Sequence, residues 1–188
     1  MSISKDDAAQ ALSEIDQARG RVRSLAAYAQ AAPYLVLWGI AWLVADTAIA
    51  LSPRAFWVWP AVIAVATLVN VGIAVAQARE VGAGQTRSPH WKALATALIC
   101  VVFLASLFLV LSPLGGKQIH SVFGLFFGSV YVVMGLWLGW RLVALGLALA
   151  GLTLVAYYAL PMGGGYPLFM GVVAGGALIV GGLWLRKI

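Results

Sequence analysis

The chain has 188 residues, of which 63% are hydrophobic and only 10% are charged, with a formal net charge of +6 and a mean hydropathy of +0.97. This composition lies far outside the range of soluble globular domains, so the sequence predicts an integral membrane protein. The single cysteine, Cys100, excludes an internal disulfide and any metal site built from several cysteines of one chain. The first residues lack the apolar core and the cleavage motif of a signal peptide, so we expect no cleaved leader.

The N-terminal segment, residues 1–31, is polar and is predicted to form a cytoplasmic or interfacial amphipathic helix. Its apolar and small residues follow a three-four alternation that places them on one stripe, which includes Leu12, Ile15 and Val22. Acidic residues come first and basic residues follow, so the basic half lies next to the membrane, where anionic head groups attract it. Three interpretations remain open: the helix lies on the bilayer, it docks against a partner or a sister subunit, or it is a solvated topology anchor.

Residues 32–188 are predicted to form an all-α transmembrane bundle. Six apolar stretches are each long enough to cross about 30 Å of hydrocarbon at about 1.5 Å per residue. Membrane strands would require an alternation of lipid-facing and polar positions, and runs such as 142–156 do not alternate. The predicted spans cover about residues 34–51, 56–78, 92–111, 119–140, 142–160 and 166–185.

Lys and Arg are distributed unequally between the two ends of these spans. One side holds only Arg54 and Lys117. The other side, which includes both termini, holds Lys5, Arg19, Arg21, Arg23, Arg79, Arg87, Lys92, Arg141, Arg186 and Lys187. Short loops that stay in the cytoplasm keep the excess of basic residues, so we expect both termini in the cytoplasm. The positive net charge is therefore mainly a topology signal and not a nucleic-acid-binding surface.

A pattern of helix ends recurs three times along the chain. Odd-numbered spans end at a proline, namely Pro53, Pro113 and Pro161, whereas even-numbered spans end with a glycine and then an arginine. Proline cannot continue a helix, and arginine anchors the cytoplasmic rim. The pattern predicts three hairpins, which come either from an internal repeat or from these local preferences alone.

Asp46 is the only acidic residue predicted to lie within a span, where a carboxylate is costly unless it is paired, protonated or hydrated. It lies five residues before the outer end of the first span, about 7–8 Å below the outer interface. Other polar residues fall at comparable or lesser depth: Arg54, His120, Tyr157 and Tyr158. We expect an outward-facing polar cluster around the carboxylate. Asp46 is then either a proton or cation site at the mouth of a pathway, or a structural tie to Arg54 across the first hairpin.

Trp38 and Trp42 precede Asp46 by two turns and one turn of helix, so the three side chains share one face. Aromatic rings beside a carboxylate suit a cation site. The sequence therefore adds Trp38 and Trp42 to the candidate cluster. The remaining tryptophans fit the aromatic belt at the membrane–water interfaces: Trp57, Trp59, Trp91, Trp137, Trp140 and Trp184.

Glycines at four-residue spacing occur in the fourth and sixth spans. The pairs are Gly124 with Gly128, Gly135 with Gly139, and Gly171 with Gly175. Small residues at this spacing let helix backbones approach closely, so we expect both spans to pack at tight interfaces.

No catalytic, cofactor-binding or metal-binding motif is recognisable in the sequence. Two histidines, one at the membrane edge and one in a loop, cannot supply an intramembrane metal site or the paired axial ligands of a haem. Metalloprotease and nucleophile-elbow motifs are absent from the sequence. We therefore expect a non-enzymatic protein without a cofactor.

Two functions from different classes remain. The first is an assembly or regulatory subunit of the membrane that contacts itself or a membrane-protein partner through its helices. The alternative is a small oligomeric channel or secondary transporter for protons, cations or a small solute that uses Asp46. The scarcity of polar groups in the spans favours the first, although a hydrophobically gated pore would escape that argument. The bias towards Ala, Gly, Val, Leu and Arg points to a bacterial inner membrane.

Overall fold

A computed structural model describes residues 5–80, 90–161 and 163–187 of the chain. These residues form helices and turns, and no strand occurs among them. The elements, in chain order, are α1 (Lys5–Leu51), a 3₁₀ turn η1 (Pro53–Trp57), α2 (Val58–Glu80), α3 (His90–Leu111), α4 (Gly116–Leu138), α5 (Trp140–Ala159), α6 (Gly165–Phe169), a π-helical turn η2 (Met170–Gly175) and α7 (Gly176–Arg186). Arg87, which contributes to the predicted topology, lies outside the described residues.

Among the residues that the structure describes, five helical runs are long and apolar enough to cross a membrane. They are Gln10–Leu51, Val58–Arg79, Gly116–Leu138, Trp140–Ala159 and Gly165–Arg186, the last of which combines α6, η2 and α7. α3 has 22 residues, and its C-terminal part Leu98–Leu111 is apolar. The prediction of an all-helical, multi-pass membrane protein is therefore confirmed, and the sixth span stays a prediction.

The N-terminal helix and the first span form one continuous helix, α1, and not the two separate helices that the sequence predicts. Pro33 lies inside α1, where it removes a backbone donor and distorts the preceding turn. Gln77 of α2 stabilises this region, because its Nε2 donates to Gln30 O at 3.0 Å and its Oε1 accepts a hydrogen bond from the Tyr34 hydroxyl at 3.1 Å. A neighbouring helix thus supplies a hydrogen-bond donor to one backbone carbonyl near the proline, an arrangement that accompanies proline inside membrane helices.

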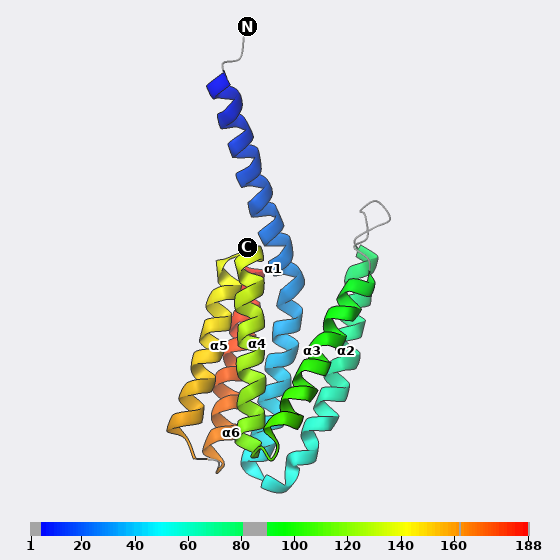
Figure 1. Cartoon of the computed structure of the whole chain (residues 1–188), viewed down its shortest axis with the longest axis vertical. Helices are drawn as coiled ribbons and strands as arrows, with labels where there is room; N and C mark the ends of the chain where they lie inside the picture. The colour runs from blue at the N-terminus through cyan, green and yellow to red at the C-terminus, as the bar shows by residue number, and fades with distance from the viewer. Residues whose placement is uncertain (1–4, 81–89, 162, 188) are drawn as a thin grey trace.

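The closest contacts in the bundle are made by two pairs of spans. α1 packs along α6, η2 and α7, and α4 packs along α5 (Figure 1). α2 contacts α1 and stands with α3 at one side of the bundle, while the N-terminal part of α1 projects beyond it (Figure 1). The closest packing therefore joins helices that belong to different predicted hairpins.

Glycines allow these close contacts. An added Cβ at Gly171 of η2 would lie 3.0 Å from the Cβ of Asp46, and one at Gly175 would lie 2.8 Å from Gly39 O. Between α4 and α5, an added Cβ at Gly128 would meet a backbone oxygen of α5 at 3.0 Å. A larger side chain at these positions would push two helices apart. The predicted tight interfaces of the fourth and sixth spans are thus confirmed as contacts within the chain.

Gly139 is a turn residue and not part of a helix-packing pair with Gly135. It separates α4 from α5 with a φ of +136°, a conformation that glycine adopts readily and other residues rarely do. The Tyr28 hydroxyl of α1 fills the space where a Cβ would be. Gly135 itself packs against the backbone of Val143 in α5, as the sequence predicts.

The last span contains a feature that the sequence does not reveal. The predicted single helix over residues 166–185 is interrupted by the π-helical turn η2. A π turn holds an extra residue in its hydrogen-bonded ring and is often found at functional sites. In this protein the turn contacts α1 at Asp46 through Gly171.

Candidate functional site

Asp46 lies in α1 where α2, α4 and the last span converge, and only 1% of its surface is exposed. Its Oδ1 accepts a hydrogen bond from Trp59 Nε1 of α2 at 3.1 Å. Its Oδ2 is buried and has no hydrogen-bond partner among the described residues. Buried carboxylate oxygens are rarely left unpaired, because the lost hydration costs free energy. The free oxygen therefore marks a place for water or a ligand.

His120 of α4 is the second polar group of the site. Its Nε2 lies 3.1 Å from Asp46 Oδ1, within ion-pair distance. The contact is not a directed hydrogen bond, since both ring nitrogens of His120 lack an aligned partner among the described residues. Three aromatic rings surround the imidazole, with centroid distances of 5.3 Å to Trp42, 5.5 Å to Trp59 and 5.8 Å to Tyr166. Rings from α1, α2 and α6 thus enclose the acid–imidazole pair.

A cavity of about 780 Å³ lies beside this pair, and we call it the Asp46 cavity. Its walls come from α1, α2, α4 and the beginning of the last span, and they include both Asp46 and His120. Trp38 and Trp42 line the same cavity, as does Phe127 of α4, whose ring stacks on Trp38 at a centroid distance of 6.4 Å. The helix face that carries Trp38, Trp42 and Asp46 therefore opens onto one largely apolar cavity.

Tyr166 is fixed against His120 by a polar network of α4. Its hydroxyl lies 2.7 Å from Ser121 Oγ, and it also donates to Lys117 O at 3.4 Å. The Lys117 ammonium donates to Leu160 O at 2.6 Å. The positive charge of Lys117 is therefore engaged at the end of α5 and not at the Asp46 carboxylate.

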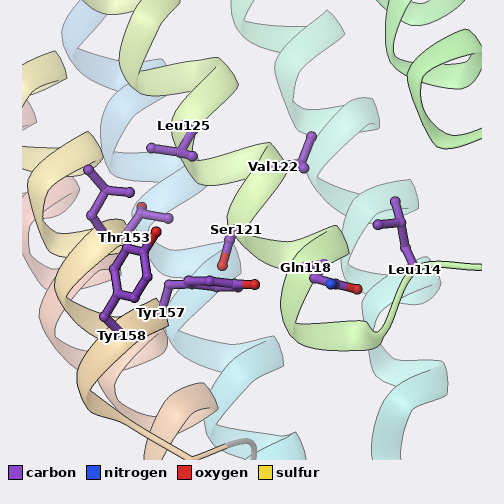
Figure 2. A pocket seen from close by; sticks show the side chains of 9 residues that line it. Leu114, Gln118, Ser121, Val122, Leu125, Thr153, Tyr157 and Tyr158 are labelled. Carbon is purple, nitrogen blue, oxygen red and sulfur yellow. The ribbon is translucent and has the colours of Figure 1, made fainter. Parts of the chain in front are cut away.

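Three predicted members of the cluster lie elsewhere. Arg54 is exposed in η1. Among the described residues, the side chain within ion-pair distance of Asp46 is His120 and not Arg54. Tyr157 and Tyr158 of α5 line a separate cavity of about 260 Å³, with residues of α4 on its opposite wall (Figure 2). The sequence predicts these three residues at a depth comparable to or less than that of Asp46, but they lie at other positions around the bundle.

Two residues of the site are not recognised from the sequence. Trp59, which the sequence assigns to the aromatic belt, is the hydrogen-bond donor to Asp46, and Tyr166 forms one wall of the His120 cage. Both lie about one turn or less from the outer end of a predicted span, which is slightly shallower than Asp46. A search for polar and aromatic residues near the outer end of every span, and not only of the spans with charged residues, would have indicated Trp59 and Tyr166 as members of the site.

The chemistry of the site is that of one carboxylate and one imidazole. No group of three or more His, Cys, Asp or Glu side chains that could hold a metal ion occurs in the described part of the chain. A carboxylate in this setting can attract a positive charge. Comparison with protein-family models, with curated proteins and with solved structures finds no match.

Proposed function

We propose that the chain is a small secondary transporter or channel that takes a proton, a cation or a small solute at the Asp46 cavity. The observation that carries this proposal is a carboxylate with 1% exposure and one unpartnered oxygen in the wall of a cavity of about 780 Å³. Ionisable groups buried at membrane depth are costly and typically mark the pathways of ions and substrates.

The proposed setting is a bacterial inner membrane, with six spans in three hairpins, both termini in the cytoplasm and several copies of the chain assembled together. The unequal distribution of Lys and Arg supports this orientation. In this orientation the Asp46 end of the bundle faces the outside, whereas the projecting part of α1 lies in the cytoplasm (Figure 1). A solute would reach Asp46 from the outer side.

Two structural features support transport over the subunit function favoured by the sequence alone. Polar groups that are scattered in the sequence meet at one point, because Asp46, Trp59, His120 and Tyr166 come from four different elements. The π-helical turn η2 contacts α1 at this point, and π turns are irregular segments at which a helix can rearrange. Secondary transporters also form their sites beside irregular or interrupted helices.

A non-enzymatic assembly or regulatory subunit is the second candidate. The projecting part of α1 favours it, since Leu12, Ile15 and Val22 expose 64%, 47% and 66% of their surfaces. An apolar stripe outside the bundle is suited to contact a partner or a sister subunit.

Flux measurements in proteoliposomes test the proposal. The wild type, Asp46→Asn and Asp16→Asn are compared with protons, K⁺ and tetraethylammonium as probes, and the melting temperature of each sample is recorded. Asp16→Asn is the matched control, because Asp16 is exposed on the projecting part of α1. We expect flux of at least one probe in the wild type and the control, and a loss of at least about tenfold in Asp46→Asn.

Two outcomes overturn the proposal. One is equal flux in all three proteins, and the other is no flux of any probe in the wild type, which would leave the assembly subunit. If Asp46→Asn lowers the melting temperature as well as the flux, His120→Gln decides the point, since it retains Asp46. A His120→Gln protein of normal stability and normal flux would also contradict the proposed site.

A further inference from the structure

We propose that the ligand of the Asp46 cavity is an organic monocation with an apolar body. This inference rests on the proposed function, since both use the same cavity, and it adds the chemical class of the ligand. It follows from the charge of the cavity, from its aromatic walls, from the small number of its oxygen ligands and from its size.

The charge of the cavity selects a cation. Asp46 is the one carboxylate in its wall, and Oδ2 is free to accept a donor. Among the described residues, the basic groups near this end of the bundle are engaged or exposed: Lys117 donates to Leu160 O, and Arg54 lies outside in η1. Among the described residues, His120 is the basic side chain in the cavity wall, and its ring nitrogens are misaligned with the carboxylate. A ligand with a positive nitrogen can therefore pair with Oδ2 without displacing an aligned hydrogen bond.

The walls of the cavity suit an organic cation. Aromatic rings line it on several sides: Trp38, Trp42, Trp59, Phe123, Phe127 and Tyr166. The negative face of an aromatic ring attracts a cation, and Trp gives the strongest attraction. The same rings exclude water and contact an apolar body. A carboxylate within an aromatic cage is the combination that binds alkylated or arylated ammonium groups.

The polar lining is too sparse for a metal cation. Calcium takes about six to eight oxygen ligands, and magnesium requires near-octahedral oxygen coordination. Asp46 is the one acidic side chain in the cavity wall, and the described residues contain no cluster of three metal-binding side chains. A desolvated metal ion would therefore lack most of its ligands.

The size of the cavity agrees with an organic ligand. At about 780 Å³ it lies within the range of about 300–1,000 Å³ that is typical of sites for drug-sized molecules. The positive nitrogen can come from a soluble amphiphilic cation or from the amine head group of a lipid. The test separates these two sources.

The test compares two ions of the same shape and opposite charge, tetraphenylphosphonium and tetraphenylborate. The full-length protein is placed in nanodiscs of an anionic lipid that has no amine, and binding is measured by equilibrium dialysis against protein-free nanodiscs. We expect saturable binding of tetraphenylphosphonium with one site per chain and no saturable binding of tetraphenylborate. Saturable binding of tetraphenylborate with equal affinity would overturn the inference, since the site would then select shape and not charge.

Variants assign the binding to the cavity. Asp46→Asn is expected to raise the Kd for tetraphenylphosphonium at least about tenfold, and Asp16→Asn is expected to leave it unchanged. Trp38→Leu retains an apolar side chain and Asp46 but removes one aromatic face, so we expect the Kd to rise roughly twofold to thirtyfold. Unchanged binding in both Asp46→Asn and Trp38→Leu would place the cation elsewhere. If Asp46→Asn does not fold, Trp38→Leu and the comparison of the two ions still decide the question.

Competition identifies the source of the cation. Phosphatidylethanolamine in the nanodiscs lowers the apparent affinity for tetraphenylphosphonium if a lipid amine uses the site, and it has no effect if the ligand is soluble. Both results keep a positively charged nitrogen on an apolar body as the group that the cavity recognises, the lipid being a zwitterion that presents such a nitrogen, whereas displacement by millimolar Mg²⁺ but not by tetraethylammonium would overturn it. The two proposals can fail separately. Binding of tetraphenylphosphonium without flux would retain the ligand class and overturn the transport function. Flux that depends on Asp46 without such binding would retain the transport function and overturn the ligand class.

Discussion

The contact between α1 and the last span predicts opposite effects for the same substitution at two adjacent glycines. An added Cβ at Gly175 would lie 2.8 Å from Gly39 O and 3.1 Å from Leu43 N, both of which are backbone atoms of α1. An added Cβ at Gly176 would have no neighbour within 4 Å. Gly176→Ala is therefore a matched control for Gly175→Ala on the same helical column.

The expected magnitudes follow from two competing terms. Replacing glycine by alanine in a helix stabilises it by about 1 kcal/mol. Overpacking costs about 1–3 kcal/mol, and Gly175→Ala lies at the upper end, because backbone atoms cannot rotate away as a side chain can. We therefore expect a net destabilisation of about 2 kcal/mol for Gly175→Ala and a stabilisation of about 1 kcal/mol for Gly176→Ala. For a chain of this size, these changes correspond to melting temperatures lower by about 4–8 °C and higher by about 2–4 °C.

Thermal unfolding in a mild detergent, followed by intrinsic tryptophan fluorescence, measures both variants against the wild type. Helical content is compared by circular dichroism, so that a local change in η2 is not mistaken for a loss of the bundle. Equal melting temperatures for the two variants would refute the close contact of α1 with η2. A larger loss for Gly176→Ala would place the other face of the last span against α1.

Two further predictions concern α4 and its neighbours. Gly124→Ala is expected to destabilise the bundle by about 1–3 kcal/mol, because the new methyl group would meet Oγ1 and Cγ2 of Thr153. Thr153→Ala in the same chain should restore most of that loss, which a double-mutant cycle of melting temperatures measures. Independent, additive effects of the two substitutions would contradict the contact. Tyr166→Phe leaves the buried Ser121 hydroxyl without its 2.7 Å partner and should cost about 1–3 kcal/mol, whereas adding Ser121→Ala to Tyr166→Phe should cost little more, because removing both partners leaves no buried group unpaired. Full additivity of Ser121→Ala and Tyr166→Phe in urea titrations would show that the two hydroxyls do not interact.

The positions of the helices could be predicted from hydropathy and helix-ending residues. The predicted outer limits at Leu51 and near Leu111 and Leu160 agree closely with the ends of α1, α3 and α5. Such signals are local, since a proline or a short polar turn ends a helix wherever it occurs. The continuity of α1 could not be predicted in the same way. Proline usually ends or breaks a helix, yet α1 continues through Pro33, and Gln77, which is distant in sequence, donates to the nearby carbonyl of Gln30.

The candidate site was only partly predictable for a related reason. The depth of a residue follows from counting along a span, so the proximity of His120 to Asp46 could be anticipated. The position of a residue around the bundle depends on which helices pack together, and the closest pairs, α4 with α5 and α1 with the last span, are joined by glycine contacts between distant segments. For this reason Tyr157 lines another cavity and Arg54 is exposed, although their sequence positions predict a place near the carboxylate.

The length of α1 connects two regions that are usually separated in membrane proteins. A helix of 47 residues with a rise of about 1.5 Å per residue is about 70 Å long, and it carries Asp46 near one end and a fully exposed polar segment at the other. A tilt of the projecting segment would therefore be transmitted along one helix towards the carboxylate. Pro33 lies between these two regions, and the hydrogen bond that proline cannot form weakens the helical connection there. The hydrogen bond from Gln77 of α2 to Gln30 O holds α1 against α2 close to Pro33, so α2 restrains α1 between the projecting segment and the carboxylate.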